Sequence, residues 1–243
     1  DVDLVIHGTT LATNAIIERK GARTAFVSTA GFTDMIDIGH ENRFEQYDLM
    51  ITRPQPLVPR PLRFGLRERI DVEGQVITAL ADEALEELAD FLASTRPESL
   101  AVCLLHSYAN ATHERLVARF VQDRFPEISV SLSCDISPLA GEYERATTTC
   151  ANAYVRPVVV DYFVRMEQRL REMGIHAPVL IVMSEGGLAS IETACEAPVR
   201  LVESGPAGGA SLAVSVAHAF GIDKLLSFDM GGTTAKICLI DHG

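Results

Sequence analysis

The stretch "FDMGGTTAK" near the C-terminus combines residue types that are suited to holding phosphate. An apolar run ends in Asp229, and the chain then turns through Gly231 and Gly232 and presents Thr233 and Thr234. Glycine lets backbone amides approach an anion closely, and threonine hydroxyls donate hydrogen bonds to phosphate oxygens. A carboxylate repels phosphate, so we expect Asp229 to hold a hydrated Mg²⁺ between itself and a nucleotide. A plain β-hairpin turn with a capping aspartate explains the same string equally well.

A second glycine-rich stretch, "ESGPAGGA", opens a predicted helix near residue 206. The start of a helix offers free amides and a partial positive charge, and both suit an anion. The candidate nucleotide-binding residues here are Gly205, Gly208 and Gly209. The alternative is that the glycines are small only so that the helix packs closely on a sheet, and the sequence favours neither reading.

A third stretch, "VMSEGGL", places Ser184 at the end of a predicted strand, followed by Gly186 and Gly187. Ligands of open α/β sheets usually bind where strands end, so these three residues are also candidates for cofactor binding. A solvated turn is the simpler interpretation of this stretch taken alone.

The fourth stretch, "HGTTLATNA", leaves a short apolar run at His7 and opens a helix at Thr9 or Thr10. Asn14 follows Thr10 by one helical turn, so the two side chains are expected to share a surface. We treat these residues as candidates for substrate contact or for a surface between lobes. A histidine with its hydrogen bonds satisfied in the core is the commoner alternative for His7.

Predicted strands and helices alternate along most of the chain, which favours a mainly parallel sheet with helices on its faces. The apolar run 100–105 reads as a central strand covered on both faces, and 112–124 reads as a helix that follows it. Asp82 is expected to cap another helix. A long helix is predicted from about 142 to 173, with Pro157 kinking or dividing it.

Composition narrows the class of protein. Lys and Arg total 21 against 33 Asp and Glu, a formal net charge of -12, which disfavours nucleic acid and anionic membranes as partners. The five cysteines form no CxxC pair, which argues against a zinc site and a disulfide framework. No apolar run approaches the ~18 residues of a membrane span. These features predict a cytoplasmic protein, and the apolar run just after Asp1 suggests that the sequence starts inside a domain.

Other polar residues offer no catalytic set by their spacing. His106 and His113 flank a predicted strand-to-helix loop, where ordinary surface histidines are the expected interpretation. The cluster from Glu142 to Arg145 precedes the long helix and is expected to lie on a solvated or interlobe surface.

Taken together, the motifs resemble the hydantoinase A/5-oxoprolinase family, which includes acetone and acetophenone carboxylase subunits. The resemblance rests on the four stretches above and on "LAVCLLHSY.N..HE" and "SPLAGEYERATTTCANAYVRPVV", which occur in the family's order over nearly the whole chain. It implies an α/β fold of the actin-like ATPase type, as in sugar kinases and Hsp70. Two lobes are expected, 1-138 and 139-243, incomplete at both ends.

The resemblance also implies a function. It predicts ATP-dependent opening of a cyclic amide such as a hydantoin or 5-oxoproline, with Asp229 and Thr233 acting in catalysis and Asp229 holding Mg²⁺. A second subunit of the hydantoinase B type is expected, and homo-oligomerisation is left open. The ATP-using subunit of a ketone carboxylase and a non-catalytic nucleotide-binding or assembly module are the alternatives. Many relatives read GGTSTD where this chain reads GGTTAK, so Lys236 replaces an acid and its role is open.

Overall fold

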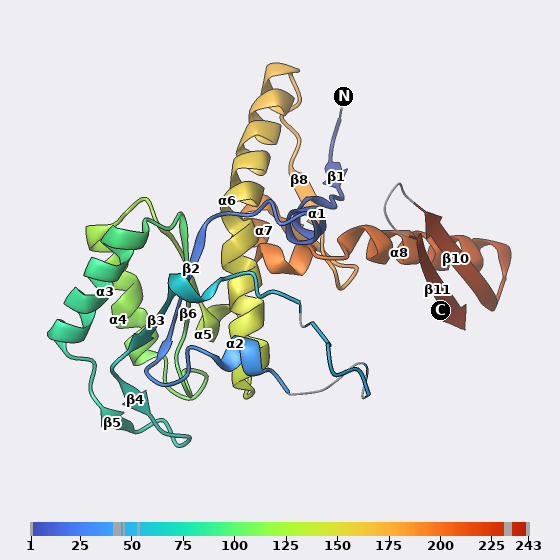
Figure 1. Cartoon of the computed structure of the whole chain (residues 1–243). Coiled ribbons are helices and arrows are strands. Elements are labelled where there is room, and N and C mark those ends of the chain that lie inside the picture. The colour runs from blue at the N-terminus through green and yellow to red at the C-terminus, as the bar shows by residue number, and fades with distance from the viewer. Residues whose placement is uncertain (1, 41–44, 46, 53, 231–234, 242–243) are drawn as a thin grey trace. The chain divides into compact units, whose positions relative to one another are not determined.

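The computed structural model describes residues 2–40, 45, 47–52, 54–230 and 235–241. Its strands are β1 Val5–His7, β2 Thr24–Thr29, β3 Arg63–Leu66, β4 Arg69–Ile70, β5 Val76–Thr78, β6 Ser99–Cys103, β7 Ser129–Leu132, β8 Val179–Val182, β9 Leu188–Ser190, β10 Lys224–Met230 and β11 Ala235–Asp241. Its α-helices are α1 Leu11–Ile17, α2 Met35–Ile38, α3 Asp82–Thr95, α4 Thr112–Arg124, α5 Ser133–Ile136, α6 Glu142–Glu172, α7 Ile191–Glu196 and α8 Ser204–Phe220. Short 3₁₀ turns lie at Arg60–Leu62 and Pro198–Leu201 (Figure 1).

The chain folds into two compact units. One unit combines residues 1–18 with 158–243, and the other contains residues 19–157. The first unit is therefore assembled from both ends of the sequence. The division at 138/139 that the sequence suggests between two lobes stays a prediction.

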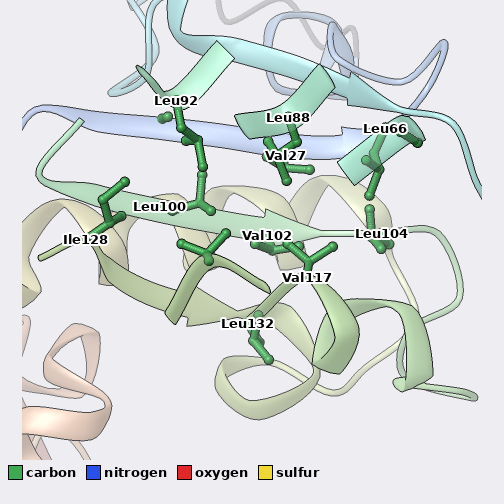
Figure 2. Close-up of a cluster of buried hydrophobic side chains, with 13 residues drawn as sticks. Val27, Leu66, Leu88, Leu92, Leu100, Val102, Leu104, Val117, Ile128 and Leu132 are labelled. Atoms are coloured by element: carbon green, nitrogen blue, oxygen red, sulfur yellow. The ribbon is translucent and has the colours of Figure 1, made fainter. Parts of the chain in front are cut away.

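A parallel sheet with the strand order β3-β2-β6-β7 forms the centre of the unit 19–157. Every residue of β6 is buried, as the apolar run predicts for a central strand. On one face of the sheet, Leu100 and Val102 pack against Leu88 of α3 and Val117 of α4 (Figure 2). Because side chains of a strand alternate between faces, the residues in between must be covered by other elements.

The opposite face of the same sheet is covered by α2 and the first half of α6. Ala101 and Cys103 of β6 belong to a buried cluster with Ala146, Cys150 and Ala153 of α6. The prediction of a central strand covered on both faces is therefore confirmed, although the strand spans Ser99–Cys103 and not 100–105. Such coverage is what a mainly parallel sheet requires, because neither of its faces is left to solvent.

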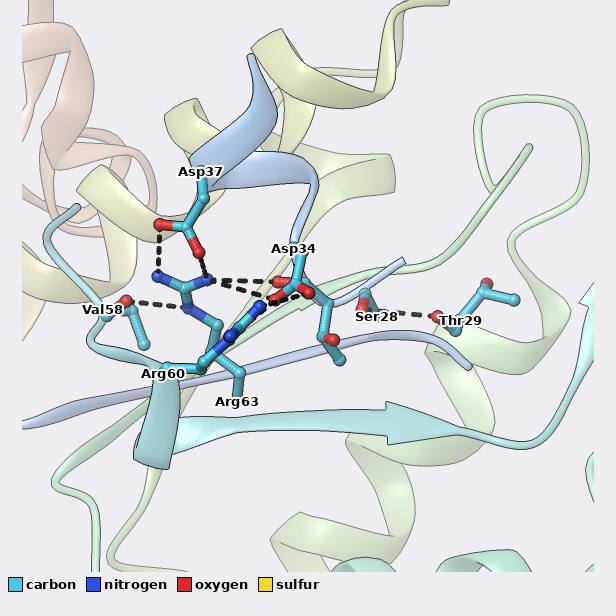
Figure 3. Close-up of polar contacts among 8 residues, drawn as sticks. Ser28, Thr29, Asp34, Asp37, Val58, Arg60 and Arg63 are labelled. Atoms are coloured by element: carbon cyan, nitrogen blue, oxygen red, sulfur yellow. Dashed lines mark hydrogen bonds and ion pairs between the residues drawn. The ribbon is translucent and has the colours of Figure 1, made fainter. Parts of the chain in front are cut away.

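Arg63 anchors the loop that precedes β3. Its guanidinium forms a bidentate pair with Asp37 of α2, and its Nε donates to the carbonyl oxygen of Val58 at 3.0 Å (Figure 3). Arg60 and Asp34 form a second ion pair beside it. The hydrogen bond from Arg63 holds the pKa of Asp37 below its usual value. These contacts order part of the proline-rich stretch that precedes β3.

The sequence predicts that Pro157 kinks or divides the long helix; α6 is not divided there, and Figure 1 shows one continuous ribbon. Proline lacks the N–H that would bond the carbonyl four residues earlier. That carbonyl belongs to Ala153, and the hydroxyl of Ser99 donates to it at 2.7 Å. The next carbonyl, of Tyr154, accepts from the amide of Ala22 at 2.9 Å. The tertiary hydrogen bond from Ser99 therefore satisfies the carbonyl that the proline would leave unpaired.

The unit of residues 1–18 and 158–243 contains a small mixed sheet and a hairpin. Strand β1 pairs in parallel with β8, and β8 pairs antiparallel with β9. Strands β10 and β11 form an antiparallel hairpin, and Figure 1 shows α8 beside it. These elements carry all four stretches that the sequence analysis singled out as candidates for ligand binding.

Several boundaries differ from prediction. Helix α3 begins at Asp82 with Ala81 as its N-cap residue, so Asp82 is not the cap but the first helical residue, where its charge still favours the helix dipole. Strand β9 was not predicted. Helix α4 has the predicted bounds. Within the described part of the chain, none of the helices combines the length and the apolar character needed to cross a bilayer.

Candidate functional site

The start of α8 is the centre of the candidate site. The residue before it, Glu203, has a left-handed backbone with φ of +67°. A non-glycine residue in that conformation costs roughly 1–2 kcal/mol and is held only where its surroundings fix it. The amides of Ser204 and Gly205 have no acceptor among the described residues. The start of α8 therefore has the free donors that a helix N-terminus can offer to an anion.

The HGTT stretch lies against this helix start. The amide of Glu203 donates to Thr13 Oγ1 at 3.1 Å, and the hydroxyl of Ser204 donates to the carbonyl of Thr9 at 3.1 Å. A Cβ added at Gly205 would meet Thr10 Cγ2 at 3.6 Å. Residues separated by almost the whole sequence are thus neighbours, because β1 and α1 pack into the same unit as α8.

The HGTT threonines also organise α1. Thr9 Oγ1 accepts from the amide of Leu11 at 3.1 Å, which satisfies one donor at the start of the helix. Asn14 Nδ2 donates to Thr10 Oγ1 at 3.3 Å. The expectation that Thr10 and Asn14 share a surface is confirmed by this contact.

His7 points toward α6 within the same unit. Its Nε2 lies 3.0 Å from the hydroxyl of Tyr162, and the two rings stack with centroids 5.8 Å apart. Burial lowers the pKa of His7 from the usual 6.5. Neutral His7 can accept the tyrosine hydrogen bond, so this geometry fits a structural histidine. Its assignment to substrate stays a prediction.

The SEGGL stretch forms the turn between β8 and β9. The amide of Gly186 donates to the carbonyl of Met183 at 3.0 Å, and Gly186 has a φ of +82°, which favours glycine. A Cβ there would lie 3.2 Å from Ser211 Oγ on α8. Ser184 donates its amide to the carbonyl of Arg200 at 2.8 Å. The turn accounts for Gly186, whereas Gly187 has no described neighbour within 4 Å of an added Cβ.

Two glycines of α8 do not serve close packing. A Cβ at Gly208 would make an ordinary contact with Val182 Cγ1 at 3.5 Å, and one at Gly209 would meet no described atom within 4 Å. The sequence left open whether these glycines serve only to let the helix approach the sheet. For Gly209 that explanation fails within the described residues, so its exposed surface is free for a ligand.

The β10–β11 hairpin carries the stretch with the strongest phosphate signal. Asp229 lies opposite Lys236 in the strand register, and the described strands end at Met230 and begin again at Ala235. The residues predicted to bind phosphate lie outside the described residues: Gly231, Gly232, Thr233 and Thr234. Lys236 Nζ pairs with the carboxylate of Glu203, so the hairpin reaches the start of α8.

All four stretches therefore meet α8. Its free amides and exposed glycine surface can hold an anion, and the threonine hydroxyls add donors. Within the described residues there is no cluster of three or more His, Cys, Asp or Glu side chains that could hold a metal ion by themselves. An Mg²⁺ at Asp229 would need ligands from water and from the nucleotide, which is how this ion is usually held.

Sequence reasoning missed a buried polar network at the ends of the parallel strands of the unit 19–157. His113 is only 3% exposed, and its Nδ1 lies 2.7 Å from a carboxylate oxygen of Glu68. Thr29 donates to the same carboxylate and accepts from the amide of Leu105 at 3.0 Å. The expectation that His113 is a surface histidine is wrong. Helical spacing offered the signal, since His113 lies on the buried stripe of α4 with Val117.

Arg145 is also buried, contrary to its expected place on a solvated or interlobe surface. Its guanidinium donates to the carbonyl of Leu104 at 2.7 Å and to the hydroxyl of Ser107 at 2.6 Å. Glu114, likewise buried, accepts from the amide of Leu104 at 2.9 Å. Arg145 and Glu114 thus both bind the backbone of Leu104, directly after β6. Local sequence shows a polar cluster and cannot show which of its members faces inward.

Comparison with known proteins gives matches over most of the chain. Residues 1–125 match the family model of the hydantoinase/oxoprolinase N-terminal region, and residues 145–243 match the hydantoinase/oxoprolinase model. The chain is 34% identical to the caprolactamase alpha subunit of Pseudomonas jessenii, over 100% of this chain and 35% of that protein. It spans about a third of the length of three curated relatives, and about a fifth of others such as the 5-oxoprolinase of Saccharomyces cerevisiae.

Two solved structures share the fold. The crystal structure of the ATP-dependent caprolactamase from Pseudomonas jessenii superposes with a TM-score of 0.89 at 33% identity, covering 98% of this chain and 35% of that one. A nucleotide-free structure of acetone carboxylase superposes with a TM-score of 0.86 at 26% identity and the same coverage of both chains. The α/β fold is of the actin-like ATPase type, as the resemblance implied.

Proposed function

The chain belongs to the hydantoinase/oxoprolinase family, and we propose that it handles the nucleotide of an enzyme that uses ATP to open a cyclic amide. The observation that supports this proposal is that the HGTT stretch and the β10–β11 hairpin both contact the start of α8, where backbone amides are free. Such a start of a helix suits a polyphosphate. A hydantoin, 5-oxoproline or another lactam is the proposed substrate class, since the caprolactamase relative is by its name a lactam hydrolase.

The chemistry follows from the low reactivity of an amide. Transfer of the terminal phosphoryl group of ATP to the amide oxygen makes the carbonyl carbon more electrophilic. This transfer releases ADP. Water then adds to that carbon and the ring C–N bond breaks as the nitrogen takes up a proton, which leaves an amine and an acyl phosphate. A second water hydrolyses the acyl phosphate to a carboxylate and phosphate. The protein's task in phosphoryl transfer is chiefly to position groups and to stabilise charge.

Individual residues take proposed roles in this reaction. Gly205, Gly208 and Gly209 of α8 lie beside the nucleotide, and the threonines at 233 and 234 donate to its phosphates. Asp229 is an exposed carboxylate at the end of β10, which fits a ligand of hydrated Mg²⁺. The bound ion neutralises charge on the phosphate oxygens. Thr233 is the second proposed catalytic residue, on the sequence alone.

A second candidate function is the ATP-using subunit of a ketone carboxylase. It is favoured by the superposition on acetone carboxylase, an enzyme described as carrying out ATP-dependent acetone carboxylation. The nucleotide chemistry is the same and the acceptor differs. A partner subunit is proposed for either enzyme, because the caprolactamase relative is an alpha subunit, and the hydantoinase B type is the form that we expect. A cytoplasmic location stays a prediction.

ATP hydrolysis by the complete protein, with any partner subunit, tests the proposal. Stimulation by 5-oxoproline, a hydantoin or caprolactam, and not by acetone with bicarbonate, is expected; the reverse pattern selects the carboxylase. Asp229→Asn should lower kcat about 10²–10³-fold, as the loss of a group that stabilises transition-state charge does. Asp161→Asn removes an exposed carboxylate from α6 as the control. Equal activity of the two variants would remove Asp229 from the mechanism.

A further inference from the structure

We propose that the ion pair between Glu203 and Lys236 is a latch that holds the described end of the β10–β11 hairpin, where Asp229 pairs with Lys236, near the start of α8. Lys236 is then a positioning residue for nucleotide binding, not a group that contacts phosphate. The inference rests on the proposed function for its effect on ATP, but the latch itself is a property of the protein without nucleotide.

The first support is the conformation of Glu203. Its left-handed backbone is one that glycine adopts most readily, yet the position carries a long acidic side chain. Both of its polar ends are engaged, since its amide donates to Thr13 Oγ1 at 3.1 Å and its carboxylate accepts from Lys236 Nζ. Glu203 therefore connects three segments, namely α1, the start of α8 and the hairpin.

The second support is the position of Lys236 in the hairpin. It lies one residue into β11, directly after the turn, and opposite Asp229. The Lys236 side chain is 27% exposed, and Ile240 on the same face of the strand is 6% exposed, although Cys238 between them is exposed. The contact of Lys236 with Glu203 therefore restrains the start of β11.

The third support is electrostatic. An unpaired carboxylate at 203 would lie next to the free amides of Ser204 and Gly205, where it would repel an approaching phosphate. Pairing with Lys236 cancels that charge without occupying the amides. Lys236 also lies across from the proposed metal ligand Asp229. The ion pair therefore neutralises Glu203. It also holds the strand ends at Asp229 and Lys236 near the start of α8.

The test is a charge-swap cycle in the complete protein: Lys236→Met, Glu203→Gln and the double variant Glu203→Lys/Lys236→Glu. The matched control is Lys224→Met, which removes the ion pair with Asp241, 3.6 Å long, at the other end of the same hairpin. Two readouts are used. Hydrogen exchange of amides 235–240 without nucleotide reports the hairpin, and titration with a fluorescent ATP analogue reports the affinity.

Each single variant should raise exchange of these amides about two- to fivefold and weaken binding of the ATP analogue by a similar factor, because the ion pair is partly exposed, and the swapped pair should restore both. The control should change neither ATP affinity nor exchange near the turn. Unchanged exchange in both single variants would overturn the latch, as would a swapped pair that regains no affinity, since Lys236 would then contact phosphate directly. A wild-type protein that does not bind the analogue, but shows the expected exchange cycle, keeps the latch and refutes the proposed function instead.

Discussion

Substitution of Gly209 by alanine distinguishes the two explanations of the glycines in α8, which are close packing of the helix and binding of a nucleotide. Glycine in a helix interior is less favourable than alanine by about 0.8–1.0 kcal/mol. A Cβ at Gly209 meets no described atom within 4 Å, so no steric cost offsets this gain. The free energy of unfolding should therefore rise by about 1 kcal/mol. At this chain length such a gain raises Tm by roughly 2–4 °C. Urea denaturation and thermal scans measure both quantities.

The same methyl group should weaken ATP binding if the nucleotide lies against this surface. Crowding by one added carbon costs typically about 1–3 kcal/mol, so Kd for ATP should rise roughly tenfold or more. Ser215→Ala, on an exposed position further along α8, serves as the control and should leave Kd unchanged. A more stable variant with unchanged Kd would show that ATP does not approach Gly209. A less stable variant would show that the space beside Gly209 does not accommodate an added methyl group.

Two further predictions concern ionisable groups, one of them buried and one half-buried. Glu68→Leu should lower the free energy of unfolding by roughly 1–3 kcal/mol, because it leaves buried donors of Thr29 and His113 without their acceptor. Glu87→Gln, at an exposed ion pair, should change it by less than about 0.5 kcal/mol, and equal effects in urea denaturation would contradict the buried network. For His7, the lowered pKa means that the unfolded chain binds a proton near pH 6.5 and the folded chain only at lower pH. Stability should therefore fall as pH drops below 6.5, and His7→Gln should flatten this dependence in unfolding curves recorded from pH 5 to 8; an unchanged slope would argue against it.

Local sequence was sufficient for elements with a clear period or a clear apolar run. Helix α4 begins and ends where its pattern predicts, and β6 is the buried strand that residues 100–105 indicate. Strand β9 was missed because three residues are too few to show alternation. Of the two effects predicted for Pro157, a kink or a division, the division does not occur. Whether a proline divides a helix depends on partners for the freed carbonyl, and Ser99 is distant in sequence.

The candidate site divides in the same way. Glycines and threonines that suit phosphate could be selected from the sequence, because their properties are local. The sequence does not show as readily that His113 and Arg145 face inward. A charged residue is usually exposed unless a partner compensates for its burial. Those partners, Glu68 and the carbonyl of Leu104, lie on other elements.

The sequence by itself determined the α/β alternation, the four glycine- and threonine-rich stretches, and the family to which they point. These properties depend on neighbouring residues, on backbone freedom at glycine and on side-chain chemistry. Only the tertiary structure decided that Thr9 and Thr13 meet the start of α8 and that Lys236 reaches Glu203. Contacts between segments so far apart depend on how strands pair and helices pack, and no local pattern records that.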